Sequence, residues 1–354
     1  MGKPSAFSEQ PALAIKEGRN EVRQQGINPD FWYPVGWADD YKPGRIHGVE
    51  IWLHRIAVYR DRSGKLGALE NACLHKGVEL HKGTVEQNCV TCPYHGWQFN
   101  ASGECIRIPY LPEGQPCPAS TIRSFPVKEK YGIIWVFPGD VNKAKAVSLP
   151  EVKEYDNSDY LMIKIPGRFF AHFSICNENA MDVFHGHLHT GLEGWFNPIL
   201  VKLDRQDDRI TAEYQVSYKG RMAKFLGLAE TATKVEHRCM DIEYHYPHYR
   251  STMSTLSSFY LLCQPIGPKE TRSYSLLFLK PNLPQWIWLP VRGLFSMLLR
   301  KRFKRFQDQD KEMMESEQPN YDTDPTANRV EFNPAIVALR QLMAKQADLS
   351  DGSK

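Results

Sequence analysis

Hydrophobic and polar positions divide the chain into a first part made of short strand-like runs and a second part that mixes strands with helices. Short β-rich runs such as 51–60 and 131–140 are separated by Gly, Pro and Asp. This pattern predicts a small all-β domain over residues 29–145. Residues 1–28 are polar and lack apolar periodicity, so we expect a leader that docks on the domains or stays mobile.

Strand and helix periods alternate from residue 146 to residue 354. Apolar and polar residues alternate around Tyr214, which predicts a strand with one buried face, and residues 257–280 predict a hairpin that turns at Pro268-Lys269-Glu270. Helical periods occur over three further segments, 176–190, 283–318 and 333–345. The second domain, 146–354, is therefore predicted to be α+β, with an antiparallel sheet followed by packing helices.

Composition narrows the classes of function. The chain has 354 residues with 42% hydrophobic and 24% charged positions, which suits two globular domains. A net charge of +3, with no basic stretch interleaved with aromatics, favours a small-molecule partner over nucleic acid. Eight cysteines are too few for a disulfide scaffold, and the N-terminus lacks the apolar run of a secretory signal. We therefore expect a reducing, cytoplasmic compartment.

Two short segments each carry one cysteine and one histidine near a glycine. Cys73 precedes His75 by two positions, and Cys92 precedes His95 by three. Four N/S ligands can bind zinc or an iron–sulfur cluster. A zinc finger usually pairs like residues at each half-site, whereas a Rieske [2Fe–2S] centre needs two cysteines on one iron and two histidines on the other. The mixed half-sites favour the Rieske centre over a zinc site or four unrelated buried residues.

The segments CLHKGVEL and CPYHGWQF match the signature of Rieske proteins, and the His-Gly-Trp ending resembles Rieske non-haem iron oxygenases rather than respiratory Rieske subunits. Respiratory subunits carry a disulfide across the two cluster loops. Cys89 lies in the second loop here, but the first loop offers it no partner, so we expect Cys89 to be free. His81 is expected to face solvent or to form a hydrogen bond rather than to bind metal.

A second cluster of polar residues lies in the predicted helix 176–190. On a regular helix Asp182, His185 and His189 would share one face, while His187 would point away. Two imidazoles and a distant carboxylate, with coordination positions left open, make the facial triad of non-haem Fe(II) oxygenases. The alternative is that the histidines cluster on a solvated helix end.

The resemblance to Rieske oxygenases extends to this segment. Catalytic domains of the family carry Asp-x-x-His, then a second His, with an Asn shortly before, here Asn179 as a possible neighbour of the ligands. Most relatives place four residues between the two histidines, but three separate His185 from His189. Either the helix is regular here where relatives bulge, or the second ligand is not His189, in which case His187 is the alternative.

The resemblance also implies a third ligand and a bridging residue. The family carboxylate lies in an acidic stretch followed by a glutamine, and aligning Gln318 with that glutamine selects Asp310, with Asp308 as the alternative. Asp182 would accept hydrogen bonds from His185 and from His95 of the partner subunit, and so would bridge the two metal centres and orient both rings.

The resemblance covers roughly residues 30–320. It implies an N-terminal all-β Rieske [2Fe–2S] domain, then a helix-grip-like (Bet v 1/START-like) antiparallel-sheet catalytic domain, assembled as a homotrimer. It further implies a monooxygenase or dioxygenase that uses O₂ and mononuclear Fe(II) to hydroxylate, demethylate or desaturate a substrate. The chain has neither a dinucleotide fingerprint nor a plant-type ferredoxin motif, so a separate ferredoxin and/or flavin reductase must supply electrons.

Segments 31–44 and 58–77 are similar to the pheophorbide a oxygenase and vanillate demethylase-like single-subunit branch, which favours a bulky apolar pigment, sterol/terpenoid or aromatic substrate. Residues 286–306 join an aromatic, apolar run to a basic cluster and are too short to span a bilayer. We expect a helix that lies in a membrane interface, with a core helix that has a basic solvated end as the alternative. The competing function is a Rieske electron-transfer or redox-sensing protein that lacks catalytic iron.

Overall fold

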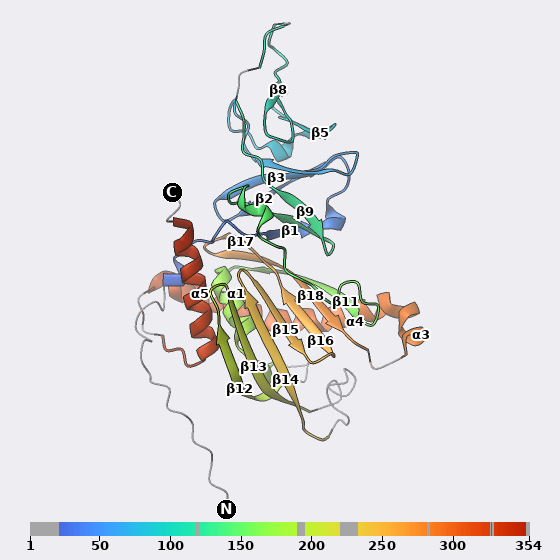
Figure 1. Ribbon diagram of the computed structural model, residues 1–354, viewed down its shortest axis with the longest axis vertical. Coiled ribbons are helices and arrows are strands. Elements are labelled where there is room, and N and C mark those ends of the chain that lie inside the picture. Colours follow the sequence, from blue (N-terminus) through green and yellow to red (C-terminus); the bar gives the residue numbers. More distant parts are fainter. Residues whose placement is uncertain are drawn as a thin grey trace, which may run out of the picture.

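The computed structural model describes residues 21–112, 114–117, 120–189, 195–219, 233–281, 284–325, 327 and 329–351. In these ranges the chain forms a smaller β-rich domain that stands on a larger domain built around one wide sheet (Figure 1). Strands are mostly antiparallel and helices are few, which confirms the expected α+β fold.

The N-terminal domain consists of three small antiparallel sheets, formed by the short apolar runs of the sequence. The first sheet has the order β1-β10-β9, the second β2-β3-β4 and the third β5-β6-β7-β8. The strands are β1 (Tyr33–Trp37), β2 (Arg45–Ile51), β3 (His54–Arg60), β4 (Leu66–Glu70), β5 (Thr84–Glu86), β6 (Cys89–Thr91), β7 (Gln98–Phe99), β8 (Cys105–Arg107), β9 (Val127–Lys130) and β10 (Ile133–Val136). Short 3-10 turns are η1 (Glu21–Arg23), η2 (Ala38–Asp40), η3 (Leu80–Lys82) and η4 (Lys143–Lys145).

The C-terminal domain is an antiparallel sheet with the order β11-β18-β16-β15-β14-β13-β12, in which β17 also pairs with β18. Its strands are β11 (Leu161–Phe169), β12 (Phe196–Arg205), β13 (Arg209–Tyr218), β14 (Glu236–His245), β15 (His248–Met253), β16 (Ser257–Leu261), β17 (Cys263–Gly267) and β18 (Glu270–Leu279). β13 alternates buried and less buried side chains around Tyr214, and β17 and β18 form the predicted hairpin.

Helices pack on this sheet and carry the segments that the later sections need. They are α1 (Phe173–Met181), α3 (Gln285–Trp288), α4 (Arg292–Thr323) and α5 (Pro334–Asp351), with 3-10 turns η5 (Gly186–Leu188) and η6 (Leu289–Val291). The helical periods predicted over 283–318 and 333–345 are confirmed by α3, α4 and α5. α4 runs along β11 and contacts α1, while α5 contacts α1 and β13.

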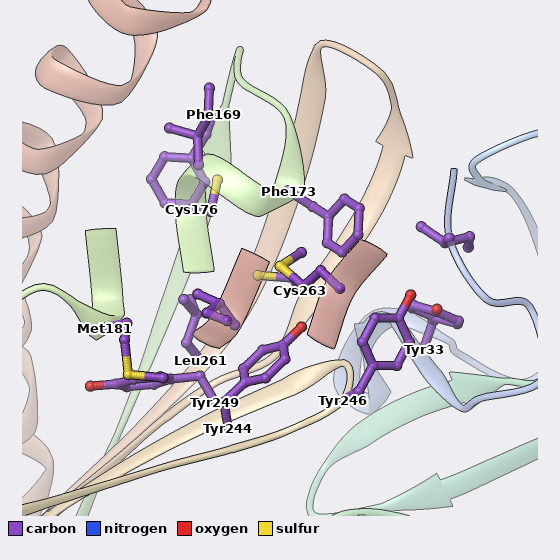
Figure 2. Packing of buried hydrophobic residues seen from close by; sticks show 14 of the residues in the cluster. Tyr33, Phe169, Phe173, Cys176, Met181, Tyr244, Tyr246, Tyr249, Leu261 and Cys263 are labelled. Atoms are coloured by element: carbon purple, nitrogen blue, oxygen red, sulfur yellow. The ribbon is translucent and has the colours of Figure 1, made fainter. Parts of the chain in front are cut away.

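The two domains share one hydrophobic core. Tyr33 of β1 lies beside Tyr246 of the β14–β15 turn, and Phe173 of α1 and Cys263 of β17 continue the same buried cluster (Figure 2). The backbone N–H of Trp52 also donates to the Pro265 carbonyl at 2.8 Å. Because apolar packing and backbone hydrogen bonds cross the contact, the two domains form a continuous unit.

Residues 21–28, which the sequence places in the polar leader 1–28, are part of this folded unit, whereas residues 1–20 lie outside the described residues. Val22 and Ile27 are buried in the shared core. The side chain of Arg23 is buried and pairs with Glu178 of α1 at 2.9 Å. The end of the expected leader therefore docks on the C-terminal domain.

Candidate metal centres and active site

The two Cys/His segments fold into loops of the same form in the N-terminal domain, between β4 and β5 and between β6 and β7. In the first loop the N–H of Gly77 donates to the Cys73 carbonyl at 2.8 Å, and in the second the N–H of Gly96 donates to the Cys92 carbonyl at 3.1 Å. Both glycines have left-handed φ angles, +67° and +71°, which other residues adopt only with strain. Each cysteine therefore begins a tight turn that its glycine closes.

The four side chains of these loops converge. Cys73 and Cys92 are both buried, and burial raises the pKa of the Cys73 thiol. The rings of His75 and His95 lie with centroids 4.6 Å apart on the outer side, and the Trp97 indole stacks on His75 with an interplanar angle of 5°. Two thiols on the inner side and two imidazoles on the outer side are the donor set of a Rieske cluster, so these residues fit that group.

His81 and Cys89 lie near this centre in the sequence, but each has its own surroundings in the fold. The ring of His81 lies 2.9 Å from the Asn71 amide nitrogen, and its backbone N–H donates to the same side chain. His81 is thus hydrogen-bonded within the domain. Cys89 has no disulfide partner among the described residues and is partly buried.

The prediction of a single helix over residues 176–190 is wrong. α1 ends at Met181, Asp182 has an extended backbone, and the chain continues through the short turn η5. The cause is local, because Asp182 Oδ1 accepts a hydrogen bond from the Phe184 N–H at 3.0 Å, a side-chain contact that replaces the next turn of helix. The Trp195 ring then packs on Gly186 so closely that no larger residue fits there.

The broken helix nevertheless brings the two histidines together. His185 Nε2 lies 3.4 Å from Asp310 Oδ1 of α4, and His189 Nε2 lies 3.2 Å from the same oxygen. The three ligand atoms lie within 4.8 Å of one another. The unusual spacing of the histidines is therefore taken up by an irregular turn, and Asp310 reaches both rings from a separate helix.

Both rings are held so that their Nε2 atoms face the shared carboxylate. His185 donates from Nδ1 to Asp182 Oδ2 at 3.3 Å, and His189 donates from Nδ1 to Gln309 Oε1 at 3.0 Å. His189 Nε2 is buried and has no hydrogen-bond partner among the described residues. An imidazole whose Nδ1 is fixed by an acceptor and whose Nε2 is free is prepared for a metal ion, so the group fits mononuclear iron.

The carboxylates give the site a strong preference for positive charge. Burial lowers the pKa of His185, but its hydrogen bonds to Asp182 and Asp310 outweigh burial and raise the pKa to about 9. Burial alone would raise the pKa of Asp310, yet the His185 and His189 rings beside its Oδ1 bring the pKa below its ordinary value. A bound cation would replace the proton that these groups attract.

The alternative ligands lie outside this group. His187 is exposed in η5, and Asp308 is exposed and pairs with Lys304 at 2.8 Å. Asn179 of α1 lies next to the site and donates from Nδ2 to Asp310 Oδ1 at 3.4 Å.

Sequence reasoning missed two neighbours of His189. Phe306 stacks on its ring with a centroid distance of 3.5 Å, and Gln309 accepts from its Nδ1. Phe306 lies one helical turn before Asp310 on the same face of α4, whereas Gln309 directly precedes Asp310 and lies beside that face. The helical period of α4 could have indicated Phe306, but nothing in the sequence indicates that Gln309 reaches His189.

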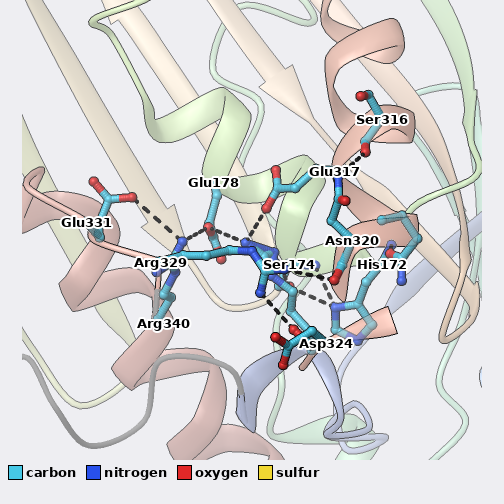
Figure 3. Close-up of polar contacts among 12 residues, drawn as sticks. His172, Ser174, Glu178, Ser316, Glu317, Asn320, Asp324, Arg329, Glu331 and Arg340 are labelled. Atoms are coloured by element: carbon cyan, nitrogen blue, oxygen red, sulfur yellow. Dashed lines mark hydrogen bonds and ion pairs between the residues drawn. The ribbon is translucent and has the colours of Figure 1, made fainter. Parts of the chain in front are cut away.

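A buried ionic network holds the elements that carry the site (Figure 3). Glu178 of α1 accepts from Arg23 at 2.9 Å and from Arg340 of α5 at 2.6 Å. Arg23 also pairs with Glu317 of α4 at 2.7 Å. In addition, Gln318 of α4 accepts from the backbone N–H of His172 at 2.7 Å, at the start of α1. These contacts fix α1 and α4, and hence the histidines and Asp310, relative to one another.

A mostly apolar cavity opens beside His185 and Asp310, two of the three candidate ligands. The volume of this cavity is about 250 Å³. Asn179, Asp182, His185 and Asp310 supply polar groups at the metal site. The remaining walls come mainly from the sheet and from α4, with residues that include Phe169, Met240, Phe259, Leu277 and Phe303. The cavity therefore suits an apolar molecule whose reacting carbon lies near the candidate iron ligands.

Comparison with protein families gives two matches that together cover most of the chain. Residues 31–126 match the Rieske [2Fe-2S] domain, and residues 169–349 match the vanillate O-demethylase oxygenase C-terminal domain.

Several similar individual proteins are named as oxygenases. The chain is 30% identical to 4beta-methylsterol monooxygenase of Methylococcus capsulatus over 92% of this chain and 89% of the relative. It is 28% identical to chlorophyllide a oxygenase of Oryza sativa subsp. japonica over 56% of this chain and 37% of that protein. The fold matches the crystal structure of dicamba monooxygenase bound to 3,6-dichlorosalicylic acid with a TM-score of 0.79, at 19% identity, over 93% of this chain and 100% of that one.

Proposed function

This chain belongs to the Rieske oxygenases that carry a vanillate O-demethylase-type C-terminal domain, and we propose that it oxygenates a bulky apolar substrate held in the cavity beside His185, His189 and Asp310. Its membership makes it an oxidoreductase with a Rieske [2Fe–2S] cluster, mononuclear non-haem iron and O₂ as co-substrate. The observation that carries the proposal is the convergence of three ligand atoms at the wall of an apolar cavity.

Each residue of the site has a defined part in this proposal. Cys73, Cys92, His75 and His95 hold the cluster, while His185, His189 and Asp310 hold the mononuclear iron. When bound, these groups supply the one-electron chemistry that activates O₂. Asp182 and Gln309 fix the two rings through Nδ1, so that both present Nε2 to the ion. The apolar walls exclude water and position the substrate carbon.

The substrate class follows from the cavity and from the family. Aromatic and aliphatic side chains dominate the walls, and polar groups concentrate near the candidate iron ligands. Relatives are named for a 4beta-methylsterol, for chlorophyllide a and for a 3-ketosteroid. We therefore expect a sterol or terpenoid, a pigment or an aromatic compound, which is hydroxylated, demethylated or desaturated.

The proposal includes a homotrimer in which the cluster of one subunit serves the iron of the next. Leu74 and Tyr94 are exposed next to the cluster histidines, and Phe184 and Leu188 are exposed next to Asp182. Two different apolar patches on one chain suit a head-to-tail contact, which closes into a ring. In that contact Asp182, whose side chain is 31% exposed, would accept from His95 of the partner subunit.

Electrons would come from a separate ferredoxin and/or flavin reductase. Two relatives are named as parts of larger systems, one as the iron-sulfur subunit of a toluene-4-sulfonate monooxygenase system and one as the oxygenase component of a 3-ketosteroid-9-alpha-monooxygenase. A Rieske carrier without catalytic iron is the competing function. It is less well supported, because a carrier has no need for His185, His189 and Asp310 to converge.

The proposed location is cytoplasmic, with peripheral attachment to a membrane surface. None of the described helices is both long enough and apolar enough to cross a bilayer. The candidate for attachment is the helical stretch that follows β18, from α3 into α4.

The test is to purify the protein without oxygen and to measure iron and turnover. We expect about three iron atoms per chain, two in the cluster and one in the mononuclear site, and a new ferrous–nitrosyl EPR signal with nitric oxide. With a ferredoxin, a flavin reductase, NADH and O₂, detergent-dispersed sterols, pigments and aromatics should give an oxidised product by mass spectrometry. A Rieske signal without a nitrosyl signal, even after Fe(II) is added, would favour the carrier function.

A further inference from the structure

The N-terminal part of α4 has two apolar faces, of which only one packs on the protein. Phe295, Leu299 and Phe303 face inward against β11 and β18, in a cluster that includes Ile163. On the opposite face Leu294, Met297 and Leu298 are more than half exposed. A helix of a water-soluble domain normally has charged or polar residues on its outer face, so this exposed face needs a partner.

The exposed apolar surface extends into the elements that precede α4. Trp286 of α3 is 78% exposed, and Ile287 and Val291 are also exposed. These residues form a continuous stretch of chain with the outward face of α4, since α3, η6 and α4 follow one another directly. We call Trp286, Ile287, Val291, Leu294, Met297 and Leu298 the α3–α4 surface.

The charge beside this surface has one sign. Between residues 286 and 306 the chain has no Asp or Glu but has six basic residues, Arg292, Arg300, Lys301, Arg302, Lys304 and Arg305. Lys301 and Arg305 are exposed and follow Leu294 and Leu298 at helical spacing, so they continue the same outward face. Of the six, Lys304 has a carboxylate partner, Asp308 at the next turn.

An apolar face beside unbalanced positive charge, with tryptophan at its edge, matches the surface of a bilayer that contains anionic lipids. The apolar side chains would enter the acyl boundary, and the cations would meet the phosphate groups. A second protein chain would match equally well only with an acidic rim around its own apolar patch.

We propose that the α3–α4 surface docks this protein on an anionic membrane leaflet, from which the apolar substrate passes to the cavity. The inference rests on the proposed function for the identity of that substrate. Phe303 and Phe306 of the same helix line the cavity, together with Leu256 and Leu279. The helix that would lie on the lipid therefore also forms a wall of the substrate site.

The experiment is sedimentation of the full-length holoprotein with vesicles of phosphatidylcholine alone, or of phosphatidylcholine and phosphatidylglycerol in equal parts. We expect binding to the anionic vesicles and at least about tenfold weaker binding to neutral ones. The double variant L294S/L298S should lose at least about tenfold in affinity, because it removes apolar area from the interface. K301E/R305E should lose a similar factor on anionic vesicles, and added salt should weaken the wild type.

Two matched variants control for the chemistry of these substitutions. F332S removes an apolar side chain that is 85% exposed but lies outside the α3–α4 surface, and R62E/K65E reverses two exposed charges near the β3–β4 turn. Both should bind vesicles as the wild type does. Circular dichroism should give the same helix content for all variants, since every altered side chain is exposed.

Three results would overturn the inference. They are no binding of the wild type to anionic vesicles, unchanged binding by L294S/L298S, and a change in oligomeric state of that variant by light scattering without vesicles. The last result would assign the surface to contact between chains.

Turnover of detergent-dispersed substrate separates this inference from the proposed function. A variant that loses vesicle binding but keeps turnover supports both. A wild type that binds vesicles yet oxidises no apolar compound overturns the proposed function and leaves the docking surface standing.

Discussion

The two candidate metal centres are built in opposite ways. The candidate cluster ligands lie on two loops of the N-terminal domain, one between β4 and β5 and the other between β6 and β7, and in each loop the N–H of a left-handed glycine donates to the carbonyl of the cysteine. The candidate iron ligands come from the irregular segment after α1 and from α4, where Asn179 and Asp310 are in contact although they are 131 positions apart. The cluster site therefore depends on local loop geometry, whereas the iron site depends on how the whole C-terminal domain packs.

The difference also suits the two tasks. A cluster that only passes electrons needs a fixed shell near the surface, and the ring of His75 is exposed. A centre that acts on a substrate needs open coordination positions beside a cavity, so its ligands must come from elements that also form the cavity walls. α4 fulfils both needs, since it carries Asp310 and lines the cavity with Phe303 and Phe306.

The largest expected effect comes from removing an iron ligand, which should separate the two centres. Asp310→Ala should lose the mononuclear iron and lower product formation by at least about a thousandfold, because the shared carboxylate contact of both histidines is gone. The Rieske EPR signal should be unchanged. The matched control is Asp308→Ala, which alters an exposed residue of the same helix and should retain iron and turnover. Equal losses in both variants would contradict the ligand assignment.

The second prediction concerns the residue proposed to link the centres. Asp182→Asn should keep both metals, because Asp182 is not among the three converging ligands, yet turnover should fall by about a hundredfold. The measurement is single-turnover reduction and product formation with a pre-reduced cluster, together with iron content. Normal transfer in this variant would show that Asp182 does not bridge the centres.

The third prediction tests whether the iron site depends on distant packing. Glu178→Ala leaves Arg23 and Arg340 without their shared carboxylate, and should lower the free energy of unfolding by about 3–5 kcal/mol. Iron should be lost at lower denaturant than the cluster, since α1 leads to the histidines. Glu331→Ala is the control, because Glu331 is 3.6 Å from Arg340 and more exposed, and should cost less than about 1 kcal/mol. Simultaneous loss of both metals would remove the contrast between the sites.

The smallest effect is an acid dependence that arises at the shared core. Burial lowers the pKa of His172 to about 3, with Arg23 adding to the effect, and burial also lowers the pKa of His248 to about 3. Histidine in the unfolded chain titrates near 6.5, so between pH 6.5 and 3 the unfolded state binds more protons than the folded state. Stability should therefore fall as pH falls through this range.

Denaturant unfolding at several pH values measures this dependence. In His248→Gln one titrating ring is gone, while the amide can still donate to the Trp32 carbonyl that His248 contacts at 3.0 Å. The slope of stability against pH should be smaller in this variant. An unchanged slope would assign the acid sensitivity to the carboxylates instead.

The contrast between the centres also explains where sequence reasoning succeeded. Cys73, His75, Cys92 and His95 could be found because loop ligands lie at fixed short spacings and local glycines define the turns. Strand β13 and the β17–β18 hairpin could be predicted because a strand with one buried face has apolar side chains at every second position. The order of strands in the sheet is not contained in such periods.

The iron site was only partly accessible from the sequence. A regular helix was predicted through His185 and His189, but the hydrogen bond from Phe184 to Asp182 ends α1 at Met181, and such competition between side chain and backbone leaves no mark in hydrophobic periodicity. The choice of Asp310 over Asp308 followed from family resemblance. In the structure the side chain of Asp310 points toward the histidines, whereas that of Asp308 points toward Lys304.

The sequence by itself determined the α+β class and which donor atoms were available, because residue type, spacing and periodicity are local properties. Tertiary structure decided which donors meet, where the cavity lies and which face of α4 stays exposed. These depend on packing between α1, α4, α5 and the sheet, and on the buried contacts of Arg23, Glu178 and Arg340. Contacts between residues far apart in the chain are fixed by the total burial and pairing of many groups, and no short segment records them.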